Sequence, residues 1–211
     1  MKIQIYLIRH GKTAANLEHR YLGTTDEELC EIGKRELEKR KQDMPHVDLL
    51  FSSPMIRCRQ TCDILFPAMT YDIVEEYREM NFGDFERKNY KELKENADYQ
   101  RWIDSNGTIA FPNGENREQF IERQMTGFEK MCDTIKEKQK AGNEITRVAA
   151  VVHGGTIMAV LSALSGGEYF DFQCKNGQGY SFHWEDSKMW DINLFDVAVK
   201  RHWSDTYSIW K

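Results

Sequence analysis

The sequence predicts an α/β fold: a three-layer sandwich with a mostly parallel central sheet, helices on both faces and an antiparallel hairpin at one edge. Three observations support this prediction. Short apolar runs alternate with longer segments of helical periodicity, as in parallel sheets whose strands are joined by helices. Two of the runs end in continuously apolar stretches, Tyr6–Ile8 and Val148–Val152, which is typical of strands covered on both faces. Near its end the chain alternates apolar and polar residues around a short turn, which indicates a hairpin.

The first half of the chain carries three predicted strands and two predicted helices. The first helix is rich in charged residues and stops near Pro45, because proline cannot continue a helix. Ser53 and Pro54 are typical of an N-cap followed by proline at the first helical position. In order, we expect a strand at Lys2–Ile8, a helix at Glu31–Met44, a strand at Val47–Ser53, a helix at Pro54–Leu65 and a strand at Tyr71–Tyr77.

The second half opens with a polar, aromatic segment over Arg87–Asn116, which contains the turn-forming pairs Asn106-Gly107 and Asn113-Gly114. Because such pairs interrupt regular structure, we predict a small cap insertion here. The alternation of helix and strand then resumes. We expect a helix at Arg117–Lys140, a strand at Arg147–Val152, a helix at Thr156–Ser165, and hairpin strands at Gly179–Glu185 and Met189–Lys200 joined by Asp186-Ser187-Lys188.

Length and composition favour one globular domain over residues 1–211, with the cap insertion at about 87–116. No apolar run approaches the roughly 20 residues that span a membrane, and the apolar run after Lys2 is too short for a secretory signal. The five cysteines are scattered and odd in number, which is typical of a reducing compartment. We therefore expect a cytoplasmic protein with no membrane partner, and a homodimer is an open alternative to a monomer.

Two of the predicted buried strands end on a histidine followed by glycine. His10 and Gly11 follow the first strand, and His153 and Gly154 follow the strand that begins at Arg147. Ligands of open α/β sheets gather at the carboxyl ends of the strands. One histidine in such a place is more often an ordinary packed side chain, but two are hard to explain by packing. The glycines would let the backbone approach a ligand closely.

Arginines accompany both histidines. Arg9 precedes His10, and Arg57 lies in the first turn after Ser53-Pro54. A guanidinium offers a planar fork that matches phosphate oxygens and stays charged. The net charge of −5 argues against nucleic-acid binding, but a few arginines in one cleft can still attract a small anion. The sequence therefore predicts a pocket for a dianionic phosphate at this edge of the sheet.

The same residues resemble the histidine phosphatase superfamily, which includes cofactor-dependent phosphoglycerate mutases and small-molecule phosphatases. Four blocks carry the resemblance in order along the chain, with the segment FPNGEN at 111–116 as a further match before the long helix. The blocks are Arg9-His10-Gly11 with Thr13 and Asn16, Ser52-Ser53-Pro54 with Arg57 and Gln60-Thr61, Glu79 in REMNFGDFE, and His153-Gly154-Gly155.

Three positions depart from the family's usual pattern. Lys12 stands where glutamate is common, Cys30 replaces a serine or threonine, and Arg87 replaces the glycine that commonly follows the residue matching Glu86. None of them is a core catalytic position of the family. The departures therefore concern substrate contacts rather than the chemistry.

The resemblance implies phosphoryl transfer through a histidine. His10 would be the nucleophile and would hold the phosphoryl group as a phosphohistidine until water takes it. Glu79 would give a proton to the leaving oxygen. Arg9, Arg57 and His153 would stabilise the transferring oxygens, so we expect neither a metal ion nor a cofactor. The implied phosphate-binding set is Arg9, Asn16, Gly23, Arg57, Glu79, His153 and Gly154, together with the backbone of Gly11 and Gly155.

The expected partner is a small-molecule phosphate ester. Within the family, the chain looks most like the α-ribazole-phosphate phosphatases of cobalamin nucleotide-loop assembly. Two alternatives stay open, a cofactor-dependent phosphoglycerate mutase and a non-catalytic phosphate-binding protein. The cap aromatics could stack on a substrate ring or pack the cap against the body, and we favour packing. They are Tyr90, Tyr99, Trp102 and Phe111.

Overall fold

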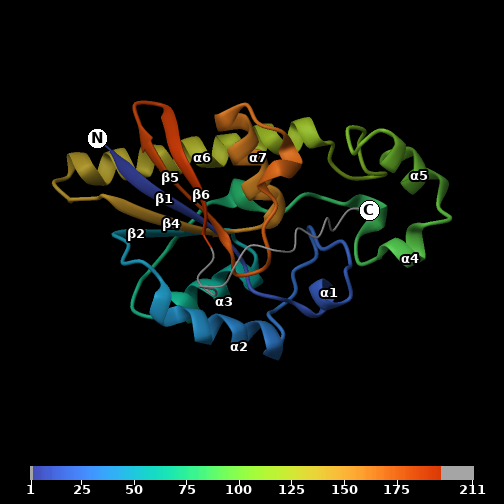
Figure 1. Cartoon of the computed structure of the whole chain (residues 1–211), viewed down its shortest axis with the longest axis horizontal. Coiled ribbons are helices and arrows are strands. Elements are labelled where there is room, and N and C mark those ends of the chain that lie inside the picture. Colours follow the sequence, from blue (N-terminus) through green and yellow to red (C-terminus); the bar gives the residue numbers. More distant parts are fainter. Residues whose placement is uncertain (1, 196–211) are drawn as a thin grey trace.

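A six-stranded sheet in the order β3-β2-β4-β1-β5-β6 lies at the centre of the computed structural model, which describes residues 2–195 (Figure 1). The first four strands in that order are parallel. β5 and β6 are antiparallel and complete one edge. The predicted mixed sheet with an antiparallel edge hairpin is therefore confirmed.

Helices and strands alternate along the chain before the final hairpin. The strands are β1 (Ile3–Arg9), β2 (Leu49–Ser52), β3 (Asp72–Ile73), β4 (Arg147–Val152), β5 (Gly179–Glu185) and β6 (Lys188–Phe195). The α-helices are α1 (Ala14–Leu17), α2 (Glu31–Arg40), α3 (Ile56–Leu65), α4 (Tyr90–Leu93), α5 (Ala97–Asp104), α6 (Arg117–Lys140) and α7 (Gly154–Ser165). Short 3-10 turns are η1 (Lys41–Asp43), η2 (Glu75–Tyr77), η3 (Gly83–Phe85) and η4 (Tyr169–Phe172). In the part of the chain that the structure covers, no helix is long and apolar enough to cross a membrane.

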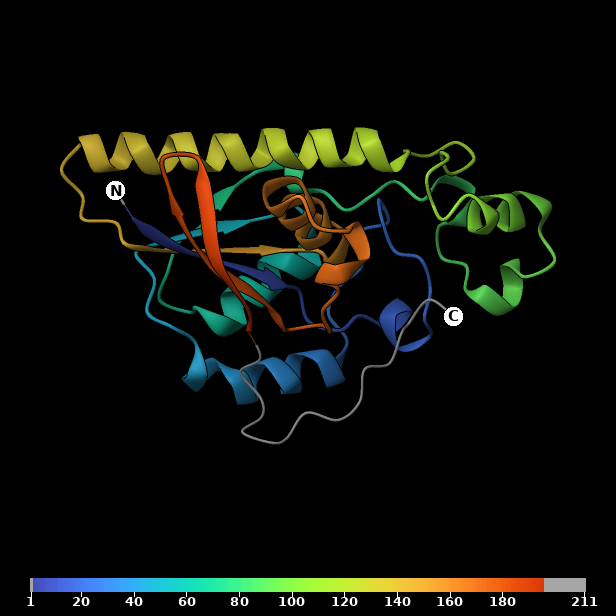
Figure 2. The same ribbon diagram turned by 45° about the horizontal axis from the view of Figure 1, so that its top comes forward.

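The sheet separates two apolar cores, which makes three layers. Successive side chains of a strand point to opposite faces, and β1 follows this rule. Ile5 and Leu7 lie in the core shared with α6 and α7, whereas Tyr6 and Ile8 lie in the core shared with α2 and α3. Figure 2 shows α6 above the sheet and α2 below it. Both faces of β1 are covered, as its continuous apolar run predicts.

The predicted strand at Tyr71–Tyr77 is mostly wrong. β3 contains only Asp72 and Ile73, which pair with Phe51 and Ser52 at the end of β2. The N–H of Val74 still donates to the carbonyl of Ser52 at 3.0 Å, where β2 ends, and the chain then turns into η2 and buries Tyr77 in the core. A strand longer than its neighbour would leave backbone groups without hydrogen bonds.

Other boundaries differ by less. The second hairpin strand begins at Lys188, and the remainder of its predicted range, 196–200, lies outside the described residues. The helix expected from Pro54 begins at Ile56, and the helix expected from Thr156 begins at Gly154. The helix expected to reach Met44 ends at Arg40 and continues as η1.

The segment predicted to be a cap insertion contains α4 and α5, and its apolar side chains share one core with Tyr21, Phe120 of α6 and Ala159 of α7. Tyr99, Trp102 and Phe111 are buried there, and the ring of Trp102 stacks on that of Phe111 at 4.8 Å. Tyr90 is 63% exposed. Three of the four cap aromatics thus pack this segment against the body of the protein, in agreement with the interpretation favoured from the sequence.

Candidate active site

The two histidines lie side by side because their strands are neighbours in register. Arg9 of β1 pairs with Val152 of β4, so the next residue of each chain segment leaves the sheet at the same level. The backbone N–H of His10 donates to the carbonyl of Val152 at 2.9 Å. The rings of His10 and His153 are 5.2 Å apart and meet edge to face at 66°.

A backbone carbonyl fixes the tautomer of His10. Its Nδ1 lies 2.6 Å from the carbonyl oxygen of Gly11, which can only accept a hydrogen bond, so Nδ1 carries the proton and Nε2 keeps a lone pair. The ring is buried. Burial lowers the pKa of His10 well below 6.5, and the charges of Arg57 and Arg9 lower it further. His10 is therefore neutral at physiological pH, with Nε2 as a free nitrogen.

His153 is also neutral, but its partners fix the opposite tautomer. The Nε of Arg57 donates to Nδ1 of His153 at 3.3 Å, so Nε2 carries the proton and donates to Oγ of Ser53 at 2.8 Å. Burial, and then the charge of Arg57, hold the pKa of His153 well below 6.5. The sequence prediction that Ser53 caps a helix is wrong, because the N-cap is Met55 and the Ser53 hydroxyl bonds to the histidine.

Arg57 is fully buried and is held by the loop that precedes α2. Nη1 donates to the carbonyl of Thr25 at 2.9 Å, and Nη2 donates to the carbonyls of Gly23 and Leu22 at 3.0 and 3.4 Å. With the Nε bond to His153, four of its five N–H groups have protein acceptors. The guanidinium is therefore fixed in place before any ligand arrives.

Only some of the N–H groups of Arg9 have hydrogen-bond acceptors within the protein. Its Nη1 donates to the carbonyl of Cys174 at 2.7 Å. Its Nε is buried and has no hydrogen-bond partner. A buried donor without an acceptor is costly, and an anion placed between Arg9 and His10 would supply one.

Glu79 reaches the site from the loop between η2 and η3. Its Oε1 accepts the N–H of Met80 at 2.9 Å, and Oε2 accepts the N–H of Gly155 at 3.2 Å. Burial raises the pKa of this carboxyl above 4.5, although these two N–H groups and the charges of Arg57 and Arg9 oppose the rise. The structure thus brings Arg9, His10, Arg57, Glu79 and His153 together.

The backbone N–H groups predicted to bind phosphate, those of Gly11, Gly23 and Gly155, have partners within the protein. The N–H of Gly11 donates to Oγ1 of Thr61 at 3.0 Å, and that of Gly23 donates to both carboxylate oxygens of Glu86 at 3.1 Å. The N–H of Gly155 donates to Glu79. In this structure all three groups therefore bind protein oxygens, and Gly154 lies against the guanidinium of Arg9 at the start of α7.

Asn176 joins the site although sequence reasoning assigned it no role. Its Nδ2 donates to the carbonyl of His10 and to Oδ1 of Asn16, both at 3.1 Å. Oδ1 of Asn16 also accepts the N–H of Thr13. The amide of Asn16 therefore has its oxygen turned to the protein and its Nδ2 left to donate. No local pattern marks Asn176, whose only signal is its place just before the hairpin.

Two of the three departures from the family pattern have structural roles. Lys12 forms a 2.7 Å ion pair with Glu36 of α2. Cys30 is the N-cap of α2, and its Sγ accepts the N–H of Gly33 at 3.4 Å. Neither side chain is among the partners of the histidines given above.

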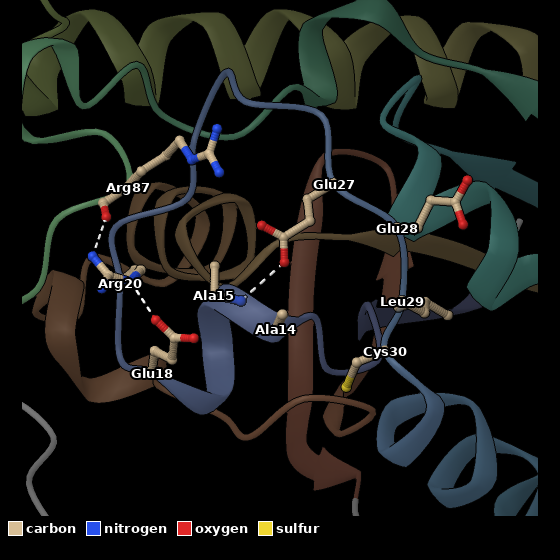
Figure 3. Close-up of a pocket in the computed structure, with 9 residues that line it drawn as sticks. All are labelled: Ala14, Ala15, Glu18, Arg20, Glu27, Glu28, Leu29, Cys30 and Arg87. Atoms are coloured by element: carbon tan, nitrogen blue, oxygen red, sulfur yellow. Dashed lines mark hydrogen bonds and ion pairs between the residues drawn. The ribbon is translucent and has the colours of Figure 1, made fainter.

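A cavity of about 650 Å³ lies beside α1 (Figure 3). Its rim includes the ion pair between Arg20 and Glu18 and the hydrogen bond from the N–H of Ala15 to Glu27. None of its lining residues belongs to the predicted site. They are Ala14, Ala15, Glu18, Arg20, Glu27, Glu28, Leu29, Cys30 and Arg87.

Within residues 2–195, no group of three or more His, Cys, Asp or Glu side chains is placed to hold a metal ion. The positive charge at the site comes from the guanidinium groups of Arg9 and Arg57. Fold and site together define a class: an α/β protein with a neutral histidine pair, two arginines and a buried glutamate at the carboxyl edge of its sheet.

Comparison with known proteins agrees with this class. The model of the histidine phosphatase superfamily (branch 1) matches residues 5–197, and the chain belongs to that family. The uncharacterized phosphatase PhoE of Bacillus subtilis is 29% identical over 168 residues, 78% of either chain. Phosphoserine phosphatase 1 of Hydrogenobacter thermophilus is 26% identical over 195 residues, 88% of this chain and 89% of its own.

A solved structure supports the fold. The α-ribazole phosphatase from Shigella flexneri superposes with a TM-score of 0.78 at 23% identity, over 95% of this chain and 100% of its own. The family and the names of the relatives indicate an enzyme of the phosphatase and mutase group.

Proposed function

We propose that the protein is a phosphomonoesterase that hydrolyses a small-molecule phosphate ester through a phosphohistidine on His10. The observation that carries this proposal is the 2.6 Å contact between Nδ1 of His10 and the carbonyl of Gly11. It leaves Nε2 unprotonated beside Arg9, whose Nε has no partner. A nucleophile and a cation for the phosphate are thus already in place.

In the first step, Nε2 of His10 attacks phosphorus, the N–P bond forms and the ester P–O bond breaks. The leaving oxygen takes a proton from Glu79, whose raised pKa favours the protonated form required. In the second step, Glu79 as carboxylate removes a proton from water, the water oxygen attacks phosphorus, and the N–P bond breaks. The products are the alcohol and inorganic phosphate, and both side chains return to their starting forms.

The two arginines provide the electrostatic stabilisation in this proposal, because both ring nitrogens of His153 already have protein partners in Arg57 and Ser53. Arg9 and Arg57 face the transferring oxygens with charges that need no rearrangement. Arg57 also donates to His153, which holds the neutral ring beside His10. The reaction therefore needs no metal ion, which an assay in the presence of excess chelator tests directly.

The substrate class is a small phosphate monoester. Two candidate compounds come from the names of relatives, phosphoserine and α-ribazole phosphate. Purified protein should be assayed against a panel that includes both, together with phosphoglycerates and p-nitrophenyl phosphate. Interconversion of phosphoglycerates after priming by 2,3-bisphosphoglycerate would instead establish a mutase.

Rapid acid-free quenching with labelled substrate tests the nucleophile. We expect an acid-labile, base-stable label on the wild-type protein and none on His10→Ala, with activity reduced at least about a thousandfold. His46→Ala is the matched control, because the side chain of His46 is 83% exposed. A label retained by His10→Ala would contradict the assignment, and no hydrolysis of any ester by the wild type would favour a binding protein.

A further inference from the structure

The segment that carries Glu79 has no helix or strand to support it. Glu79 lies between η2, which ends at Tyr77, and η3, which begins at Gly83. Its carboxyl group is nevertheless buried and held at a defined place beside Gly155. Because backbone groups in such a segment need partners from elsewhere, the side chains that supply them determine where Glu79 lies.

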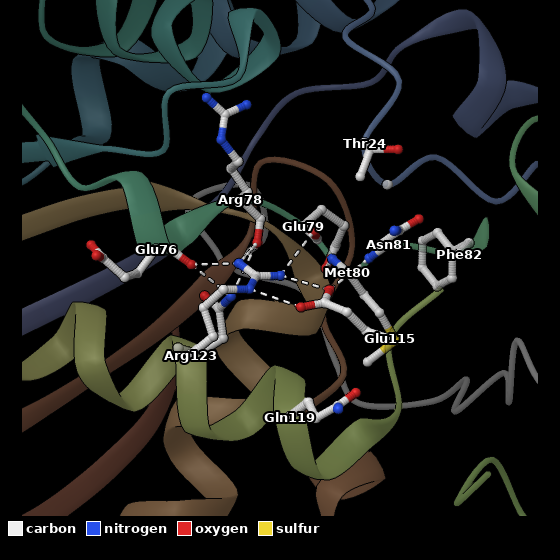
Figure 4. Close-up of polar contacts among 12 residues, drawn as sticks. Thr24, Glu76, Arg78, Glu79, Met80, Asn81, Phe82, Glu115, Gln119 and Arg123 are labelled. Carbon is white, nitrogen blue, oxygen red and sulfur yellow. Dashed lines mark hydrogen bonds and ion pairs between the residues drawn. The ribbon is translucent and has the colours of Figure 1, made fainter. Parts of the chain in front are cut away.

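Arg123 of α6 is the partner of three carbonyl groups in this segment (Figure 4). Its Nη1 donates to the carbonyls of Glu76 and Arg78 at 2.7 and 2.9 Å, and its Nη2 lies 3.3 Å from the carbonyl of Glu79 itself. One planar guanidinium thus binds three carbonyl oxygens within four residues. A lysine ammonium has three donors at a single point and cannot span them in the same way.

Glu115 completes the arrangement from the other side. Its carboxylate forms a two-point ion pair with Arg123, with Nε to Oε1 at 2.9 Å and Nη2 to Oε2 at 2.7 Å. Oε2 also accepts the N–H of Asn81 at 2.8 Å, and the N–H of Glu115 donates to the carbonyl of Asn81 at 2.9 Å. The chain is therefore held on both sides of Glu79 by one ion pair.

We propose that Glu115 and Arg123 are positioning residues for Glu79, and that they set how well the enzyme expels poor leaving groups. This inference rests on the proposed function, in which Glu79 is the proton donor. It also gives a role to the segment FPNGEN, whose glutamate is Glu115. Neither residue is placed among the groups that meet the phosphate.

A purely structural role would give a different result, because the segment has further anchors. Nε2 of Gln124 donates to the carbonyls of Glu76 and Arg78 at 2.9 and 3.0 Å. Lys130 forms an ion pair with the side chain of Glu76. Neither contacts Glu79, so loss of Arg123 leaves the segment attached to α6 and removes the hydrogen bond to the backbone carbonyl of Glu79.

Leaving-group dependence is the decisive measurement. Proton donation matters greatly for alkyl phosphates and little for p-nitrophenyl phosphate, whose leaving group departs as a stable anion. We expect Arg123→Gln to lower kcat/KM about 10- to 100-fold for alkyl esters and less than about threefold for the p-nitrophenyl ester. Arg123→Lys and Glu115→Gln should show the same pattern with a smaller loss.

Glu79→Gln and Lys130→Gln are the reference variants, and thermal unfolding is followed for all of them. In Glu79→Gln the loss of kcat/KM relative to the wild type should depend most steeply on the leaving group. Lys130→Gln should keep the wild-type kcat/KM for every ester. An equal loss for all esters in Arg123→Gln and Arg123→Lys, or no loss, overturns the positioning role while Glu79 stays the acid. Should Glu79→Gln itself lose activity equally for all esters, the proposed acid fails, and the positioning role fails with it.

Discussion

Nη1 of Arg57 donates to the carbonyl oxygen of Thr25 at 2.9 Å, and the loop that presents this carbonyl is fixed by a residue of another segment. The carboxylate of Glu86 accepts the N–H groups of Gly23, Thr24 and Thr25 and the hydroxyl of Thr25. Glu86 stands where the chain enters the cap. A cap-side carboxylate therefore determines the position of a guanidinium at the sheet edge.

Glu86→Gln should weaken phosphate binding. An amide has one acceptor oxygen, and its NH₂ would face N–H donors that the carboxylate now binds. The loop and Arg57 would shift, and bonds to charged groups contribute about 1.5–3 kcal/mol. We expect the inhibition constant of inorganic phosphate to rise about tenfold, equivalent to about 1.4 kcal/mol, with KM rising in parallel.

Glu18→Gln is the control for this variant. Glu18 is an exposed carboxylate whose ion-pair partner is Arg20, at the surface. Its loss changes the net charge by the same amount without touching the loop. Equal inhibition constants in Glu86→Gln and the wild type would show that the loop holds Arg57 without Glu86.

The paired histidines should make stability depend on pH. Burial keeps His10 and His153 neutral in the folded protein, with pKa values well below 6.5. Below about pH 6.5 the unfolded chain binds protons that the folded protein does not. The free energy of unfolding therefore falls as the pH falls, by at most about 1.4 kcal/mol per pH unit for each ring, until the folded pKa values are reached.

Urea unfolding of wild type and His10→Gln/His153→Gln from neutral pH to about pH 5.5 measures this contribution. The double variant should show a flatter dependence. His46→Gln, which removes an exposed ring, should follow the wild type. Parallel curves for the double variant and the wild type would mean that the two rings do not titrate differently on unfolding.

Local patterns explain what the sequence predicts well. The apolar run at Lys2–Ile8 is a strand because both of its faces are buried, and the structure moves it by one residue to Ile3–Arg9. His10 and His153 could be paired from sequence because parallel strands end at a common edge. The long helix at Arg117–Lys140 has the predicted bounds.

Residues that act across long separations could not be found in this way. Asn176 bonds to Asn16 from 160 positions away, and Arg123 binds carbonyls 44 to 47 positions earlier. Their roles depend on how the finished sheet and helices bring distant segments together. The N-cap prediction for Ser53 is wrong for the same reason, since the partner of its hydroxyl, His153, lies 100 residues further on.

The cap aromatics should contribute to stability rather than to substrate binding. Trp102 is buried and stacks on Phe111 and Tyr99, so Trp102→Ala should lower the free energy of unfolding by about 3–5 kcal/mol. Tyr90→Ala, at an exposed position, should change it by less than about 0.5 kcal/mol. Chemical denaturation measures both values. A raised KM in Trp102→Leu at unchanged stability would point instead to stacking on the substrate.

Arg87 stands where the backbone favours glycine. Its φ is +62°, in the left-handed region, which costs a residue with a Cβ about 1–2 kcal/mol. The carbonyl of Arg87 accepts a bond from Arg20, and its N–H donates to the carbonyl of Tyr21 at 2.8 Å, so the surrounding structure holds this conformation. Arg87→Gly should relieve the strain, while the added freedom of the unfolded chain offsets about 0.4–1 kcal/mol of the gain. We expect a net increase of up to about 1 kcal/mol in the free energy of unfolding.

Arg87→Ala separates this effect from loss of the side chain, because alanine keeps the Cβ and should bring no gain. A stabilised Arg87→Ala would show that the guanidinium, rather than the backbone, is the source of the strain.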